Sequence, residues 1–182
     1  MKKLTFIHIC FSLTAICLVN TAFAQEKDAL VLNHAKASAD VYKEFINLSP
    51  TTAANTLAKE DVSNRTQRSF NKLFQNGHPS WSAVEKNFLA TFEVDGRNAR
   101  ALFTKSGYNL YTIIRGKEMN LPAEVRSAIK SQYYDFAIGT VNEVRVAGNT
   151  AWFVNLQSDK ELIVVRVIDT TVDKVTHYAL GK

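Results

Sequence analysis

Three histidines outside the N-terminal apolar segment, His34, His78 and His177, are the side chains best suited to metal or acid–base chemistry. They share no metal-ligand spacing, such as two histidines four residues apart on one helix face. A histidine in a loop or strand is usually an ordinary surface residue. The sequence therefore predicts no metal site.

Nucleophilic catalysis lacks a recognisable residue set as well. No serine lies in a Gly-x-Ser-x-Gly elbow, and the two cysteines, Cys10 and Cys17, both precede residue 25. Carboxylate pairs such as Asp159 and Glu161 have the positions of solvated turn and strand-edge charges. No glycine-rich phosphate loop is present. We therefore predict a chain that is not an enzyme and needs no cofactor.

The N-terminus has the pattern of a secretory signal. Lys2 and Lys3 precede the mostly apolar stretch Leu4–Val19, and small residues follow at Ala22 and Ala24. We predict cleavage after Ala24 and a periplasmic or secreted protein. The mature chain then has no thiol and no transmembrane span.

The charge of the chain argues little for nucleic acid. The chain has 22 lysines and arginines against 17 aspartates and glutamates, or 20 against 17 once the signal is removed. This mild excess contains no basic run. We therefore predict no nucleic-acid partner, and the oligomeric state stays open.

Residues 25–62 differ in composition from the rest of the chain. They contain no glycine, one proline (Pro50) and two aromatic residues, Tyr42 and Phe45. We interpret 25–62 as a partly helical or flexible leader, and a docked N-terminal helix is the alternative. The domain boundaries are then 1–24 for the signal, 25–62 for the leader and 63–182 for an α+β domain.

Two helices are predicted in the domain. Ser63 or Asn64 can cap the first helix, whose apolar residues Phe70, Leu73 and Phe74 share one face. Gly77 can end this helix in a left-handed conformation.

The second helix is expected to start near Leu121, with Pro122 at its first position. Its apolar stripe runs through Ile129 and Phe136, and Gly139 is a plausible C-terminal stop.

Alternating apolar residues and short turns predict an antiparallel sheet around these helices. Asp95-Gly96 is a strong hairpin signal, because glycine accepts a positive φ. Short connections require antiparallel neighbours. The fold class is therefore α+β, with both helices on one face of a sheet. One hypothesis is that the domain consists of two similar halves, each a helix followed by three strands. About seven strands are expected, near residues 87–94, 99–103, 108–115, 141–146, 150–157, 162–168 and 175–180.

Aromatic residues, an Asp-Gly turn and a Leu-Pro helix start recur along the domain, at Phe70, Phe74, Trp81, Phe92, Asp95-Gly96, Leu121-Pro122, Ile129, Tyr133, Tyr134, Val144, Trp152 and Val154. This pattern resembles that of PepSY-like domains, also called β-lactamase-inhibitor-like domains, which are exported by Bacteroidetes-type bacteria. The resemblance implies helices packed on one face of a sheet, an envelope location and no catalytic residues. Inhibition of a β-lactamase does not follow from it, because a fold does not determine a function.

The sheet face away from the helices needs its own explanation. The more apolar parity of each strand, including Val144, should face the helices, and the other parity should face outward. The outward set mixes arginine with aromatic residues, the types that dominate interface energies. Two alternatives to a partner-binding face are a plain solvated face and a leader that folds back over the sheet. The candidate partner-binding residues are Arg100, Leu102, Tyr111 (of ambiguous parity), Arg145, Phe153 and Arg166.

Two functions are consistent with the sequence. The first is an exported, non-catalytic binding or inhibitory module that contacts an envelope protein or peptide through an open sheet face. The alternative is a small-ligand or envelope-stress sensor that holds an apolar compound between sheet and helix, near Tyr133, Phe136 and Trp152.

Overall fold

A computed structural model of the chain describes residues 36, 40, 42–43, 56–75 and 77–180. Every element below belongs to the unit Ala37–Lys182. The predicted signal and its cleavage site lie outside the described residues. Within the described ranges, no helix has both the length and the apolar character that crossing a membrane requires.

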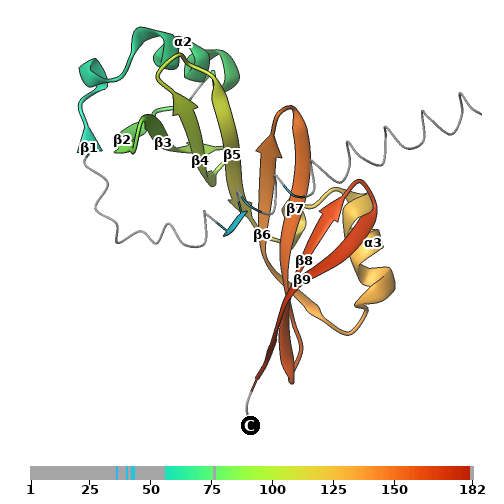
Figure 1. The fold of residues 1–182 in the computed structure, drawn as a ribbon. Coiled ribbons are helices and arrows are strands. Elements are labelled where there is room, and N and C mark those ends of the chain that lie inside the picture. The colour runs from blue at the N-terminus through green and yellow to red at the C-terminus, as the bar shows by residue number, and fades with distance from the viewer. Residues whose placement is uncertain (1–35, 37–39, 41, 44–55, 76, 181–182) are drawn as a thin grey trace, which may run out of the picture. The chain divides into compact units, whose positions relative to one another are not determined.

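The centre of the fold is a nine-stranded antiparallel sheet whose strands follow one another in chain order (Figure 1). The predicted α+β class with two helices is confirmed. The strands are β1 (Thr56–Leu57), β2 (Ser80–Val84), β3 (Asn87–Val94), β4 (Arg97–Thr104), β5 (Asn109–Gly116), β6 (Ala137–Val146), β7 (Asn149–Gln157), β8 (Glu161–Ile168) and β9 (Thr171–Ala179).

Two of these strands, β1 and β2, have no counterpart among the seven predicted ranges. β1 has two residues. β2 has five residues and includes Ser80 and Ser82, and serine gives little strand signal. Both strands form by pairing: Leu57 lies opposite Trp81, and Trp81 lies opposite Ala90 of β3.

The first helix, α2 (Asn64–Leu73), begins where its cap residue predicts. The backbone N–H of Thr66 donates to the Ser63 hydroxyl oxygen at 3.2 Å, which satisfies one of the unpaired amides of the first turn. Phe70 is fully buried, whereas Leu73 is 54% exposed. The prediction that Leu73 shares the buried face is therefore wrong, whereas Phe74, the residue that follows the helix, is buried as predicted.

Gly77 has a different role from the predicted one. Its φ is not positive; the positive-φ glycines of the described residues are Gly96, Gly107 and Gly148. A Cβ atom at Gly77 would lie 2.8 Å from Cζ of Phe70. Glycine is therefore needed here for close packing against Phe70.

The second helix, α3 (Ala123–Gln132), has Pro122 as its cap residue, one position before the predicted place. A short 3-10 turn, η2 (Glu118–Asn120), precedes it. Gly139 does not end this helix but lies inside β6, next to an irregularity in pairing between Ile138 and Val141. A Cβ atom here would lie 3.4 Å from the backbone oxygen of Asn155 on β7, an ordinary contact distance, so close packing does not require glycine at this position.

The chain repeats one arrangement, a helix followed by four antiparallel strands. α2 precedes β2–β5, and α3 precedes β6–β9 (Figure 1). The predicted repeat had three strands after each helix, because β2 was missed in the first half, whereas all four strands of the second half were predicted. β5 and β6 pair directly, although η2 and α3 lie between them in the sequence, and this pairing joins the halves into one sheet.

Each helix buries its apolar residues against its own half of the sheet. Phe70 packs edge-to-face against Phe92 (ring centroids 4.9 Å apart) and Trp81 (5.5 Å) in the first core cluster. Ile129 is fully buried in the second cluster, together with Val154 and Val165. The pairing register puts both clusters on the same face of the sheet, which we call the helix-bearing face.

Candidate functional site

The far face is the opposite side of the sheet, defined here by the side chains that alternate with the two core clusters. The pairing register connects these side chains from strand to strand: Arg100 lies opposite Ile113, Asn142 opposite Phe153, and Phe153 opposite Arg166. The far-face residues used below are Arg100, Leu102, Tyr111, Ile113, Arg115, Asn142, Val144, Phe153, Asn155, Val164 and Arg166.

Arg145 is the predicted contact residue that does not lie on the far face. It pairs with Thr112, and Thr112 pairs with the core residue Ala101, so its side chain belongs to the helix-bearing face. Val144 takes the far face instead. The predicted orientations of Arg145 and Val144 are therefore wrong. The apolar residues of β6 do not all lie on one face: Val141 belongs to the helix-bearing face, whereas Val144 belongs to the far face.

The other five predicted contact residues share the far face but differ in exposure. Leu102 is 5%, Tyr111 3% and Phe153 0% exposed, so the expectation of an open face is wrong at these positions. Arg100 and Arg166 are partly exposed. The guanidinium of Arg166 also forms an ion pair with Asp173 of β9 at 2.6 Å.

Tyr42, a residue of the leader, packs directly on the far face. Its ring stacks on that of Phe153, with centroids 4.1 Å apart and planes 13° from parallel. Tyr42 is in a helical conformation and 4% exposed. At this position the contact agrees with the alternative of a leader folded back over the sheet.

The hydroxyl end of Tyr42 lies beside polar groups of the far face. Burial raises the pKa of Tyr42 above its ordinary value of 10.0, while a hydrogen bond with Asn142 and the charge of Arg115 oppose this rise. The Oδ1 atom of Asn142 has no hydrogen-bond partner among the described residues. The amide nitrogen of Asn142 is therefore the donor to the Tyr42 hydroxyl oxygen.

Sequence reasoning missed Asn142 and did not assign Tyr42 to the site. Asn142 is 4% exposed, and asparagine is seldom buried in the middle of a strand. A polar residue within the apolar run of β6 was the available signal. Tyr42 gave a weaker one, as one of two aromatic residues in a polar leader.

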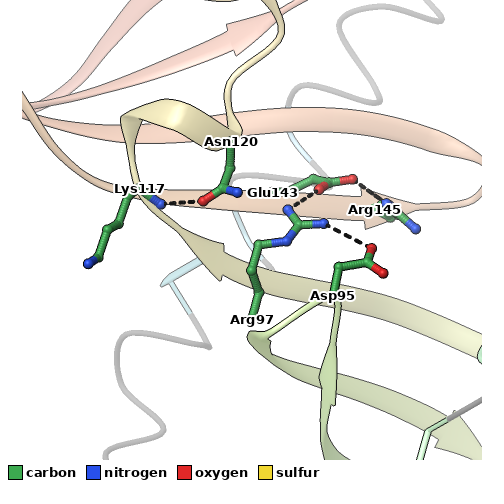
Figure 2. A network of polar contacts seen from close by, with 6 residues as sticks. All are labelled: Asp95, Arg97, Lys117, Asn120, Glu143 and Arg145. Atoms are coloured by element: carbon green, nitrogen blue, oxygen red, sulfur yellow. Dashed lines mark hydrogen bonds and ion pairs between the residues drawn. The ribbon is translucent and has the colours of Figure 1, made fainter.

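The helix-bearing face carries a second polar constellation, between the two core clusters. Figure 2 shows the guanidinium of Arg97 reaching toward Glu143 and Asp95. Arg97 lies 3.3 Å from one carboxylate oxygen of Glu143, and Nε of Arg145 donates to the other at 2.6 Å. Both oxygens of this buried carboxylate are therefore paired, which suits a structural role better than proton transfer.

An open cleft of about 1340 Å³ adjoins this network. Its walls are the β3–β4 turn, the end of β5, η2, and the starts of α3 and β6. Asn120 closes the η2 turn by accepting from the backbone N–H of Lys117 at 2.8 Å (Figure 2). The charged residues along the cleft largely pair with each other, as Arg126 does with Glu118 at 2.7 Å.

The region assigned to the sensor alternative is part of the second core cluster. Tyr133 and Phe136 pack edge-to-face with centroids 5.6 Å apart, and Trp152 packs against the same cluster. The three side chains thus contribute to the packing between α3 and the sheet.

The histidines take the ordinary positions predicted for them where the structure describes them. His177 lies on β9 and contacts the Glu161 carboxylate at 2.5 Å. His78 lies between α2 and β2, and His34 is outside the described residues. In the described part of the chain, no three His, Cys, Asp or Glu side chains group as a metal site would require.

Solved structures share this fold, although no family model and no curated protein matches the chain. A BLIP-like protein from Bacteroides fragilis has a TM-score of 0.53 and 19% identity, covering 66% of this chain and 87% of its own. A DUF2874 family protein from Bacteroides uniformis has a TM-score of 0.52 and 14% identity, covering 64% and 88%.

A third similar structure, from Bacteroides eggerthii, is provisionally described as a periplasmic protein. It has a TM-score of 0.52 and 14% identity and covers 65% of this chain and 88% of its own. These similarities support the β-lactamase-inhibitor-like part of the resemblance at the level of fold, while its PepSY-like part stays a prediction. The chain therefore has the antiparallel α+β fold of BLIP-like and DUF2874 proteins from Bacteroides.

Proposed function

We propose that this protein is an exported, non-catalytic module that binds a protein or peptide of the cell envelope through the far face. The N-terminal signal pattern and the provisional periplasmic description of a structural neighbour support the location. The expected mature protein begins after Ala24.

The stack of Tyr42 on Phe153 carries this proposal. In this contact an aromatic side chain from outside the sheet covers Phe153, which is fully buried. Partly exposed arginines, Arg100 and Arg166, lie on the same face. Aromatic anchors surrounded by arginines are typical of the residues that dominate protein interfaces.

The test is affinity capture from an envelope extract of the cells that make the protein, with the mature chain as bait. The Arg100→Ala/Arg166→Ala variant should lose at least 90% of the partner that the wild type captures. The matched control is Arg65→Ala/Arg68→Ala, which removes two exposed arginines from α2. Arg145→Ala serves as a second control, because this residue lies on the helix-bearing face.

Equal capture by the far-face variant and both controls would contradict the proposal. Thermal unfolding of each variant separates a lost contact from a lost fold. The ion pair of Arg166 with Asp173 is partly exposed, so its loss should cost at most about 1 kcal/mol of folding free energy.

A further inference from the structure

The site beneath Tyr42 has the shape of an aromatic ring. Parallel stacking at 4.1 Å covers one face of the Phe153 ring, and both side chains are almost completely removed from solvent. Stacked rings gain both from buried apolar area and from their quadrupoles. A ligand without a flat ring would leave Phe153 partly uncovered.

The site also has polar groups at the hydroxyl end of the Tyr42 ring. The Asn142 amide, itself nine-tenths buried, donates to the Tyr42 hydroxyl oxygen, and Arg115 lies close enough to influence its ionisation. A phenylalanine in this place would leave a buried donor without a partner, which is unfavourable. The combination of Phe153 and Asn142 therefore selects tyrosine over phenylalanine.

Tyr42 does not use all the hydrogen-bonding capacity around it. In the described part of the chain, the Oδ1 atoms of Asn142 and Asn155 are buried and have no hydrogen-bond partner. Asn155 lies on the same face of β7 as Phe153, two residues further along. Backbone amides of an incoming segment could donate to these acceptors, whereas the Tyr42 side chain does not.

We propose that Phe153 and Asn142 form a tyrosine-binding site, which the chain's own Tyr42 occupies in the free protein and which a tyrosine-bearing segment of the partner takes over on binding. This inference deepens the proposed binding function and depends on it for its biological meaning. The partner's segment brings backbone amides that can donate to the Oδ1 atoms of Asn142 and Asn155, for which the described residues provide no donor.

Occupation by Tyr42 has a measurable consequence for affinity. A tethered side chain competes at an effective concentration of about 1 mM, so it lowers the fraction of molecules with an open site. The apparent dissociation constant of an added ligand rises as that fraction falls. Removing the Tyr42 ring should therefore strengthen binding of a tyrosine-bearing peptide added in solution.

The first test uses a fluorescent peptide with the sequence of residues 36–48, which contains Tyr42. We expect it to bind the Tyr42→Ala protein at least tenfold more tightly than the wild type in a fluorescence-anisotropy titration. The same peptide with Tyr42→Ala should not bind, and the Tyr42→Phe peptide should bind more weakly. Equal affinity for both proteins, or binding to neither, would overturn the proposal.

The second test measures whether Tyr42 covers the site in the intact mature chain. That chain has no cysteine, since Cys10 and Cys17 precede Ala24, so Asn142→Cys provides a single reporter thiol. Adding Tyr42→Ala should raise its rate of labelling by a thiol reagent at least tenfold. A Gln132→Cys reporter, exposed on α3, should show no change.

An unchanged labelling rate in the Tyr42→Ala background would refute occupation of the site by Tyr42. If Asn142→Cys fails to fold, Asn155→Cys reports on the same face. These two tests need no envelope partner. A failed capture experiment with successful peptide and labelling tests would therefore refute the proposed function alone, and the reverse result would refute the tyrosine site alone.

Discussion

Arg97 and Glu143 lie 46 positions apart in the sequence and form an ion pair across the two halves of the fold, with 3.3 Å between Nη1 and Oε2. Arg97 is the first residue of β4, and Glu143 lies in β6. Their side chains are only 18% and 8% exposed. The helix-bearing face has a separate apolar cluster in each half, and this ion pair lies between the two clusters.

The Glu143→Gln substitution should destabilise the protein. It removes the nearer and more buried of the two carboxylates beside Arg97 while keeping the size of the side chain, and Asp95, at 3.8 Å and 82% exposed, compensates this largely buried charge only weakly. We expect a loss of about 2 kcal/mol in the free energy of unfolding, less than for a fully buried pair because Arg145 is half exposed. Urea denaturation measures this loss.

The matched control for this pair is Glu118→Gln, whose partner is Arg126. Their side chains are 37% and 53% exposed, so solvent screens the interaction and the loss should stay below about 1 kcal/mol. Equal effects of the two substitutions would show that burial does not strengthen the Glu143 pair.

The Phe70→Ala substitution should destabilise the protein much more than Leu73→Ala, a substitution on the same helix. The Phe70 side chain is fully buried and contacts four other aromatic rings, so truncation leaves a cavity at the centre of the first core cluster. We expect a loss of about 3–5 kcal/mol. Leu73→Ala, on the same helix but 54% exposed, is the control and should change stability by less than about 1 kcal/mol.

The turn between β6 and β7 offers a stabilising substitution. Ala147 has a φ of 50° and precedes Gly148, whose φ is 81°. Alanine in the left-handed region costs about 1 kcal/mol, whereas asparagine followed by glycine favours this hairpin turn. Ala147→Asn should therefore raise the free energy of unfolding by about 0.5–1 kcal/mol in urea denaturation.

Gly148→Ala is the opposite case in the same turn and should destabilise the protein, because it puts a second Cβ atom into the left-handed region. A stabilising effect of this substitution, or no gain from Ala147→Asn, would argue against strain in the turn.

The elements of this fold were predictable where local signals agree with tertiary packing. Ser63 caps α2, and the alternation around Phe92 and Phe103 places the right residues against the helices, as the sequence indicates. The errors arose where packing decides. Gly139 looks like a helix stop but lies in a strand, and Gly77 serves close packing against Phe70.

The site was less predictable than the fold for a physical reason. Alternation along one strand gives the two faces but not which face is covered, so Phe153 was correctly placed on the far face and wrongly expected to be open. Its cover comes from Tyr42, more than a hundred residues earlier. Such a contact between distant segments leaves no periodic signal in either of them.

Alkaline titration tests the burial of Tyr42 in solution. Its pKa is raised above 10.0 in the folded protein by burial, so the folded state holds its proton more tightly than the unfolded state. Burial of Tyr42 makes its full contribution to the free energy of unfolding below pH 10. This contribution is lost as the pH rises from 10 through the higher pKa of the folded state, at up to about 1.4 kcal/mol per pH unit.

The comparison of wild type with Tyr42→Phe isolates this effect, because phenylalanine does not ionise. Between pH 9 and pH 11, the wild type should lose more unfolding free energy in guanidinium chloride than the variant does. Tyr134→Phe, at an 81% exposed position, should follow the wild type. If all three proteins lose stability in parallel, the Tyr42 hydroxyl is in contact with solvent, and the stack on Phe153 does not persist in solution.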